Sequence, residues 1–298
     1  MLYTSPDERK FAKDPAVIEL GGKYYLYYSI FDGPVLGIDI AVSDDGDSFT
    51  RIGSVPLTQE CETNGIGAPA AIVIDGVVHL FYQTYGNREL DAICHATSTD
   101  AVNFTKDASN PIVAPREPWG SMPAWSCGRA IDADVVLFGT KLFLYFATRD
   151  KEFKRQIIGV AYADEHSDFS RGSFTLSPEI VLEPTLPWEQ LCIEAPAAMV
   201  HDGRLYMFYA GAYNCAPQQI GCAVSDDGIH FERLFIDAPL LANGEPGAWN
   251  ASESGHPYIY PAEDGRVWLY YQGSPDNGKT WYLSRREIGF DGGRPYLK

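Results

Sequence analysis

Five stretches of the chain share one pattern, and together they decide the fold. They read DPAVIELGGKYYLYYS (14–29), GAPAAIVIDGVVHLFYQ (67–83), IDADVVLFGTKLFLYFA (131–147), EAPAAMVHDGRLYMFYA (194–210) and GHPYIYPAEDGRVWLYYQ (255–272). Each copy holds a short apolar run, a glycine-containing turn and an aromatic run, which is typical of a β-hairpin. A second hairpin follows most copies, such as IAVSDDGDSFTRI after the first. Two hairpins per copy predict a four-stranded antiparallel sheet.

The spacing of the copies predicts an all-β, five-bladed β-propeller. The copies recur about every 55 to 65 residues, which suits one blade with its loops. Five such blades use the whole chain of 298 residues, so we expect a single catalytic domain over residues 1–298. The alternative is a two-sheet sandwich, but the even spacing and internal similarity favour the propeller. No segment has a sustained helical period, and we expect few helices.

Composition excludes several classes of partner. The formal net charge is −17 and the pI is about 4.6, so the chain lacks the clustered basic residues that bind nucleic acid or an anionic membrane. No window of about 18 apolar residues is present, and the first ten residues do not read as a leader. We therefore expect a cytoplasmic protein, or a secreted one whose leader lies outside this sequence. The six cysteines form no CxxC pair, and we expect them to be reduced.

Three acidic residues break the repeat at positions that should meet on one axis. Aligned on their aromatic runs, the first four copies place Asp14, Ala68, Asp132 and Ala195 at one position, and Glu194 lies one residue earlier in the fourth copy. The first strand of each propeller blade lines the central channel, so these carboxylates should converge. Burying a carboxylate is costly unless water, partners or a ligand compensate, so three on one axis indicate function. Asp134 would share the strand face of Asp132, but the alignment favours Asp132.

Such a trio supplies the groups that glycoside hydrolysis needs. One carboxylic acid must protonate the leaving oxygen, and one ionised carboxylate must act as base or nucleophile. A third carboxylate can raise the pKa of the acid because nearby negative charge disfavours its ionisation.

The segments DPAVIELGGKYYLYY, IDADVV and IEAPAAMVHDGRLYMFYAG resemble the three signature segments of glycoside hydrolase family 43 and of its relatives in family 32. The resemblance spans nearly the whole chain. It implies a five-bladed inverting glycosidase of the arabinofuranosidase or xylosidase type. It also implies that Asp14 is the general base, Asp132 tunes the pKa and positions the substrate, and Glu194 is the general acid.

Three alternatives stay open. A family 32-like fructosidase would retain configuration with Asp14 as nucleophile, although Lys13 and Ile131 stand where that family usually has Asn and Arg. Family 130, whose propellers carry out mannoside phosphorolysis, would need a basic phosphate pocket, with candidates Arg88, Arg129, Arg149 and Arg155. A non-catalytic carbohydrate-binding propeller could keep the trio as polar ligands.

The rest of the site is expected to bind an oligosaccharide substrate. The predicted substrate-binding residues are His256, Trp125, Arg129, Asn64, Arg285 and Trp188. His256 resembles a central-channel histidine that in some family 43 members contacts calcium, which suggests a structural Ca²⁺ near it. The tryptophans could stack on a sugar ring or fill gaps between blades. We expect no required cofactor, no protein metal-ligand set, and neither nucleic acid nor membrane as partner.

Overall fold

The computed structural model describes residues 1–114 and 128–298, and strands dominate both ranges. In chain order they are β1 (Lys13–Leu20), β2 (Lys23–Asp32), β3 (Val35–Ser43), β4 (Thr50–Val55), β5 (Ile66–Ile74), β6 (Val77–Thr84), β7 (Ile93–Ser98), β8 (Thr105–Lys106), β9 (Ile131–Phe138), β10 (Lys141–Arg149), β11 (Gln156–Asp164), β12 (Thr175–Leu176), β13 (Ile193–His201), β14 (Arg204–Gly211), β15 (Gln219–Ser225), β16 (Glu232–Arg233), β17 (Glu253–Pro261), β18 (Val267–Ser274), β19 (Tyr282–Asp291) and β20 (Arg294–Leu297). Single 3₁₀ turns lie at η1 (Glu60–Glu62), η2 (Arg88–Leu90), η3 (Arg171–Ser173) and η4 (Pro187–Glu189). None of these short helices is long and apolar enough to cross a membrane, among the residues that the structure describes.

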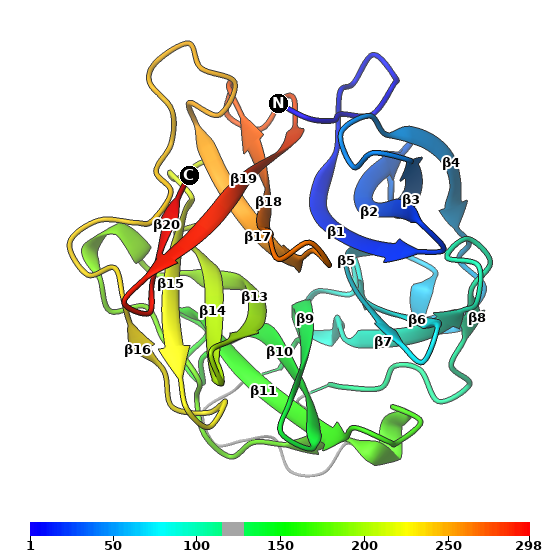
Figure 1. Cartoon of the computed structure of the whole chain (residues 1–298). Helices are drawn as coiled ribbons and strands as arrows, with labels where there is room; N and C mark the ends of the chain where they lie inside the picture. Colours follow the sequence, from blue (N-terminus) through cyan, green and yellow to red (C-terminus); the bar gives the residue numbers. More distant parts are fainter. Residues whose placement is uncertain (115–127) are drawn as a thin grey trace.

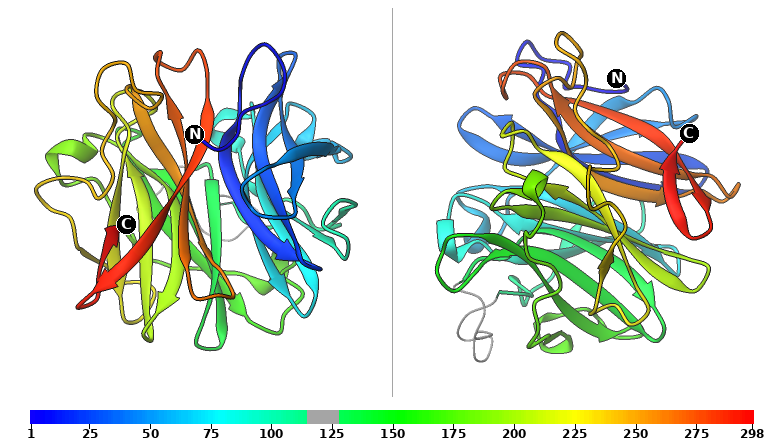
Figure 2. Two further views of the ribbon diagram at one scale, coloured as in Figure 1. Left: turned by 45° about the horizontal axis from the view of Figure 1, so that its top comes forward. Right: turned by 90° about the vertical axis from the view of Figure 1, so that its left-hand side faces the viewer.

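The strands form five antiparallel sheets of four, each built from four consecutive strands. Figure 1 shows the sheets arranged around a centre, with β1, β5, β9, β13 and β17 innermost. Each inner strand contacts the next one, and β17 contacts β1, so the ring is closed. The prediction of an all-β five-bladed propeller is confirmed, and the sandwich alternative is wrong. The side view in Figure 2 shows the loops gathered at the two ends of the channel.

The N-terminal segment joins the first blade to the fifth. The backbone N–H groups of Leu2 and Tyr3 donate to the carbonyl of Leu283 on β19, at 2.7 and 3.1 Å, and Leu283 donates back to Tyr3 at 2.8 Å. Residues near the start of the chain therefore lie against the last blade, and the N-terminus lies near β19 in Figure 1. Because β20 pairs only with the later part of β19, the N-terminal segment covers an otherwise unpaired edge.

The hydrophobic core lies between neighbouring blades, where aromatic side chains of the second strands pack. Tyr27, Tyr145 and Tyr206 come from the second strands of blades one, three and four. Each donates its hydroxyl to a backbone carbonyl of the next blade, namely Ala101, Gly228 and Gly293, at 2.8 to 2.9 Å. Buried tyrosines usually need such a partner for the hydroxyl. The aromatic run of each repeat thus forms the contact between blades.

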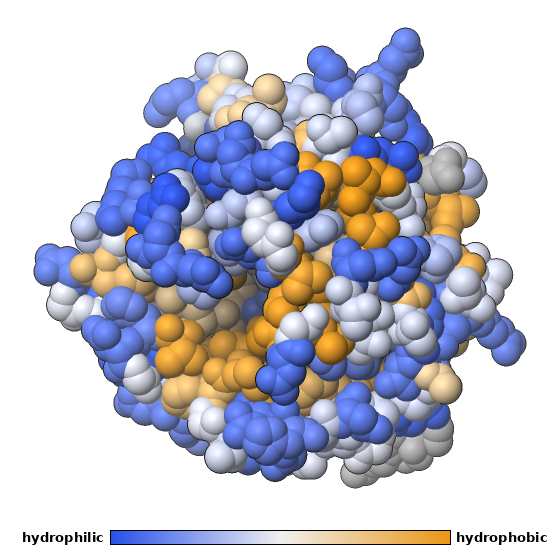
Figure 3. Space-filling view, turned by 45° about the vertical axis from the view of Figure 1, so that its right-hand side comes forward, coloured by the Kyte–Doolittle hydropathy of each residue, from blue (hydrophilic) through white to orange (hydrophobic). Residues whose placement is uncertain are grey.

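The two ends of the channel differ in character. We call the end where the inner strands begin the acid end, because Asp14, Asp132 and Glu194 lie there. At the opposite end a cavity of about 430 Å³ is lined mainly by apolar residues from the later halves of all five inner strands, including Val17, Val73 and Val135. Figure 3 shows a hollow on one face of the molecule with hydrophobic side chains gathered around it.

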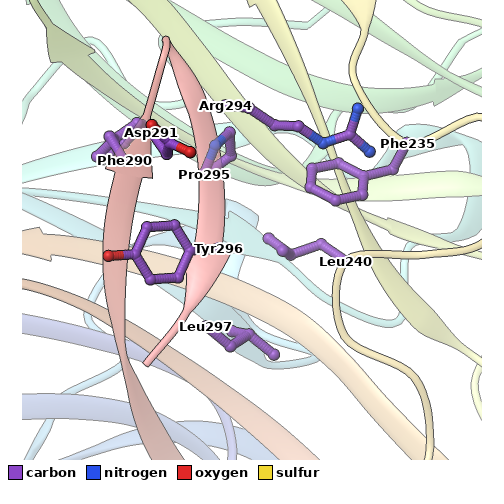
Figure 4. A pocket seen from close by; sticks show the side chains of 8 residues that line it. All are labelled: Phe235, Leu240, Phe290, Asp291, Arg294, Pro295, Tyr296 and Leu297. Atoms are coloured by element: carbon purple, nitrogen blue, oxygen red, sulfur yellow. The ribbon is translucent and has the colours of Figure 1, made fainter.

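A second hollow, of about 720 Å³, lies on the outside of the ring. It is formed by the β19–β20 hairpin and by Phe235 and Leu240 (Figure 4). The guanidinium of Arg294 lies 4.5 Å from the centroid of the Phe235 ring. The residues that line this hollow include none of the three predicted catalytic acids.

Candidate active site

One backbone irregularity recurs at the acid end of every inner strand. In each blade the pairing of the first two strands shifts by a residue, which marks a β-bulge. The residue in the bulge has a positive φ: Asp14 (53°), Ala68 (44°), Asp132 (50°), Ala195 (48°) and His256 (45°). A bulge redirects a side chain that regular pleating would point elsewhere. These five side chains therefore occupy equivalent positions around the channel.

The bulge is held by a side chain of the preceding blade. In three blades the N–H of the bulge residue donates to a side-chain oxygen on the neighbouring second strand: Asp14 to Gln272 (3.0 Å), Ala68 to Ser29 (2.8 Å) and Asp132 to Gln83 (2.7 Å). A bulge leaves a backbone group outside the strand ladder, and such a buried group needs a partner. Contacts between blades thus fix the backbone that presents two of the acids.

Asp14, Asp132 and His256 form a compact group. His256 Nε2 lies 3.3 Å from Asp14 Oδ1 and 3.5 Å from Asp132 Oδ1. Asp14 and Asp132 are 7% and 8% exposed. Burial alone would lower the pKa of His256, but the charges of Asp14 and Asp132 outweigh it and raise the pKa to about 9. The imidazole is therefore a cation between two carboxylates at neutral pH.

The pKa of Asp14 is shifted downward. Burial alone would raise it, but the positive charges of His256 and Lys13 and a hydrogen bond from Ser29 have the larger combined effect, so the net pKa lies below its ordinary value. Asp14 is consequently ionised at neutral pH, in the form that a general base needs.

Glu194 has the opposite shift. Burial first, and then the negative charge of Asp132, raise its pKa to about 7. Both of its oxygens accept hydrogen bonds from glutamine amides: Oε1 from Gln218 at 2.6 Å and Oε2 from Gln156. These donors orient the carboxyl group, and the raised pKa keeps much of it protonated near neutral pH.

Asp134 does not join this group. Its Oδ2 accepts a hydrogen bond of 2.6 Å from the backbone N–H of Ala198 on β13, and burial raises its pKa to about 7. Asp134 lies beyond the bulge, where regular pleating resumes, and it links the third blade to the fourth. The structure places Asp132, the residue that the repeat alignment selected, beside Asp14 and His256.

Besides His256, two further predicted substrate-binding residues lie at or near the acid end. Arg129 Nη2 donates to Gln156 Oε1 at 3.4 Å, so Arg129 is one side chain away from Glu194. Asn64 is exposed in the segment before β5, and its Nδ2 donates to Asn87 Oδ1 at 2.7 Å. Trp125 falls outside the described residues.

Arg285 and Trp188 make contacts between neighbouring blades. Arg285 donates to the carbonyl of Gly46 (2.9 Å) and to Asp47 Oδ1 (2.5 Å) in the turn between β3 and β4. The strand register puts this turn at the end of blade one opposite to Asp14, and Arg285 joins blades five and one there.

Trp188 packs between blades three and four. Its ring stacks on Tyr209, with the centroids 5.9 Å apart, and it covers Gly211 and Gly221, where a Cβ atom would overlap it. Trp249 covers Gly273 of blade five in the same way. The gap-filling interpretation, which the sequence left as an alternative, therefore describes Trp188.

Gln156 and Gln218 were missed by sequence reasoning, although they bind Glu194 directly. The strand register shows that they are equivalent residues at the start of the third strands of blades three and four. The sequences RQIIGVAYAD and QQIGCAVSD carry this signal, but it emerges only when the third strands are aligned as well as the first two. The pair of glutamines on neighbouring blades is what brackets the acid.

A structural calcium ion near His256 stays a prediction. No group of three or more His, Cys, Asp or Glu residues in residues 1–114 and 128–298 could hold a metal ion. The position between Asp14 and Asp132 is already occupied by the positively charged ring of His256.

Two carboxyl groups with opposite pKa shifts at one end of a channel suit the acid–base chemistry of the class of enzymes that cleave glycosidic bonds. Comparison with protein families places the chain within that class. The model of Glycosyl hydrolases family 43 matches residues 3–291, and the chain belongs to this family. The protein is therefore a glycoside hydrolase that acts on a carbohydrate.

Solved structures share the fold at low sequence identity. A thermostable family-43 glycoside hydrolase has a TM-score of 0.76 and 20% identity, covering 99% of this chain and 96% of that chain. An endo-1,4-β-xylanase from Bacteroides thetaiotaomicron has a TM-score of 0.74 and 19% identity, covering 96% and 94%. An α-L-arabinofuranosidase from Lactobacillus brevis has a TM-score of 0.72 and 16% identity, covering 95% and 93%.

A curated relative matches a shorter stretch. The 1,2-β-oligomannan phosphorylase of Thermoanaerobacter sp. (strain X514) is 30% identical over 111 residues. The match covers 33% of this chain and 38% of that protein.

Proposed function

We propose that this family 43 enzyme hydrolyses terminal or short-oligosaccharide pentosyl linkages, of the arabinofuranoside or xyloside class, with inversion of configuration. Glu194 acts as general acid and Asp14 as general base. The observation that carries the proposal is the opposite pKa shift of the two groups: that of Glu194 is raised to about 7 and that of Asp14 is lowered. The printed activities of two structural neighbours, xylanase and α-L-arabinofuranosidase, support the pentosyl class.

The mechanism follows from these protonation states. Glu194 donates its proton to the glycosidic oxygen as the bond from that oxygen to the anomeric carbon breaks. A water on the other face of the sugar attacks the anomeric carbon and gives its proton to Asp14. His256 keeps Asp14 ionised, and Gln156 and Gln218 hold Glu194 in place. Asp132 contributes negative charge that keeps Glu194 protonated.

Stereochemistry tests this mechanism. The wild-type enzyme is incubated with aryl arabinofuranoside and aryl xyloside, and the anomer formed first is followed by proton NMR. Inversion supports the proposal. Retention would instead assign Asp14 as a nucleophile, as in the fructosidase alternative, and absence of turnover with retained sugar binding would favour a binding module.

Phosphorolysis is a second candidate, favoured by the 111-residue match to the oligomannan phosphorylase. In that reaction inorganic phosphate replaces water as the attacking group, and the product is a glycosyl phosphate. Two incubations, each with and without inorganic phosphate, separate the two reactions. Formation of mannose 1-phosphate from β-1,2-mannobiose would identify a phosphorylase. Release of free sugar from an aryl pentoside would identify a hydrolase.

A further inference from the structure

Three basic side chains lie around the acid end without a salt-bridge partner within 4 Å in the described parts of the chain: Lys13, Arg129 and Arg149. Seven of the thirteen described arginines form such pairs, as Arg155 does with Asp150 at 3.0 Å. In a chain of net charge −17 carboxylates are abundant, so basic groups that remain unpaired beside the catalytic acids need another explanation.

Arg149 lies in the same row of residues as the glutamine that binds Glu194. It pairs with Gln156 across β10 and β11, and Gln156 forms a parallel bridge to Cys192, two residues before Glu194. Arg149 Nη1 donates to the hydroxyl of Tyr213, whereas its Nε is buried and has no acceptor among the described residues. The charges of Arg149 and Glu194 both act on the pKa of Cys192 and of Tyr213, in opposite directions.

Arg129 approaches Gln156 from the other side. Its Nη2 is 3.4 Å from Gln156 Oε1, and its Nε is also buried without an acceptor in the described structure. Burial raises the pKa of Asp91, and the charge of Arg129 opposes that rise without forming an ion pair with Asp91 in the described structure. A buried guanidinium N–H is costly to leave unpaired. Arg129 and Arg149 each have such an N–H group, and both lie next to Gln156, which binds Glu194.

Lys13 adds positive charge from blade one. Its Nζ is 3.5 Å from Asn214 Oδ1 and 4.4 Å from the centroid of the Trp281 ring, and its charge interacts with Asp14, Glu253, Glu194 and Asp132. Lys13 occupies the blade-one position equivalent to that of Glu194 in blade four. The acid end therefore has basic residues as well as its carboxylates, and we call Lys13, Arg129 and Arg149 the basic border.

We propose that Arg129 and Arg149, assisted by Lys13, form a subsite for the carboxylate of a uronic acid unit in the leaving group of the substrate. The subsite rests on the proposed function, because Glu194 marks the leaving-group side of the cleaved bond. Arg129 donates to its supporting glutamine, Gln156, and Arg149 is the strand partner of that glutamine. A guanidinium presents parallel donors that match the two oxygens of a carboxylate. The enzyme would thus release a neutral pentosyl unit from an acidic sugar.

A matched pair of substrates tests the subsite. Both carry the same pentosyl group, one linked to a uronic acid and the other to the methyl ester of that acid, so only the charge differs. We expect the wild-type enzyme to prefer the free acid by about tenfold in kcat/KM, mainly through KM, because a charged hydrogen bond is lost in the ester. Arg129→Met and Arg149→Met should each reduce this preference toward one.

Arg155→Met is the control, since Arg155 belongs to blade three but is paired with Asp150 and Glu183; it should keep the preference for the acid. Hydrolysis of the neutral aryl pentoside by wild type reports on the proposed function separately. Equal rates on acid and ester, or an unchanged preference in both arginine variants, would overturn the subsite. A glycosyl phosphate formed in millimolar inorganic phosphate would overturn it too, by assigning the basic border to a co-substrate.

Discussion

Asp14 in blade one and Ala68 in blade two occupy the same place in the fold and share the same backbone. Both lie in a bulge at the acid end, with φ of 53° and 44°, and both are buried, at 7% and 2% exposure. Each donates its N–H to a side chain of the preceding blade, Gln272 or Ser29. The bulge is therefore a property of the propeller, and the chemistry comes from the side chain that the bulge presents.

Glu194 teaches the complementary point, because it lies one residue before the bulge. Its equivalents are Lys13, Gly67, Ile131 and Gly255, which share neither charge nor size. At the bulge itself blade four carries Ala195, as blade two carries Ala68. The acid and the base thus reach one site from two different backbone positions.

The largest effect is expected from removing the proton of the acid. Glu194→Gln keeps the shape of the side chain but cannot donate a proton to the leaving oxygen, so kcat on an alkyl or sugar leaving group should fall by about 10⁴. The loss should be much smaller with a dinitrophenyl leaving group, which needs little protonation. Equal losses on both substrates would contradict the role of Glu194 as acid.

Asp14→Ala makes blade one resemble blade two at the bulge. Since Ala68 shows that alanine fits this backbone, we expect the variant to fold, with circular dichroism and melting close to those of wild type. Without a base to accept the proton of water, kcat should decrease by about 10³. A variant that melts far below wild type would show that the Asp14–His256 contact stabilises the fold, and the comparison with Ala68 would then fail.

Asp134→Asn separates the two aspartates of the IDAD segment by their effect on stability. Burial raises the pKa of Asp134 to about 7, above its unfolded value, so its contribution to stability is present at low pH and is lost as pH rises toward 7. Asparagine can still accept the hydrogen bond from Ala198 and does not ionise. Between about pH 4 and about pH 8, the stability of the variant relative to wild type should rise by about 4 kcal/mol in urea unfolding.

Comparing each variant with wild type at the same pH removes the contributions of Glu194 and Glu253, whose raised pKa values persist in both proteins. If the difference in unfolding free energy between Asp134→Asn and wild type did not change with pH, Asp134 would be ionised over the whole pH range.

Asp132→Asn should move the alkaline limb of the activity profile. In wild type kcat/KM should fall as pH rises past about 7, because Glu194 loses its proton there. The negative charge of Asp132 helps to raise that pKa, so the variant should lose activity at a pH about one unit lower. Ala70→Ser, outside the bulge, serves as a control that should leave the limb in place. An unmoved limb in Asp132→Asn would remove Asp132 from the tuning of the acid.

The fold and the positions of the acids were predictable because the first strands of the repeats contain the sequence pattern that indicates both. Asp14 and Asp132 are recognisable because Ala68 and Ala195 occupy the equivalent positions, which shows that the fold does not require an acid there. Gln156 was not predicted, since a hydrogen bond from a third strand to the next blade depends on packing between sheets. This comparison across blades works best where the backbone positions are equivalent.

The roles of Arg285 and Trp188 in substrate binding stay predictions, and their contacts between blades could not be read from the sequence for a related reason. Long side chains can reach several ångströms in directions that the local pattern does not reveal, and these two were drawn into contacts between blades. Tryptophan and arginine are enriched at binding sites and also fill and link packed layers. Residue type alone therefore could not separate substrate contact from blade packing.

The smallest effect tests the bulge itself, in a blade without catalytic acids. Ala68→Gly relieves a positive φ of 44°, whereas Ala70→Gly, two residues further along β5, removes a methyl group from ordinary extended backbone. Both alanines are almost fully buried, at 2% and 1% exposure, so the loss of packing is nearly matched. Ala68→Gly should therefore be less destabilising than Ala70→Gly by about 1 kcal/mol in urea unfolding. Equal losses of stability would show that the positive φ of Ala68 costs little, because the hydrogen bond from Ala68 to Ser29 of the preceding blade holds the bulge in place.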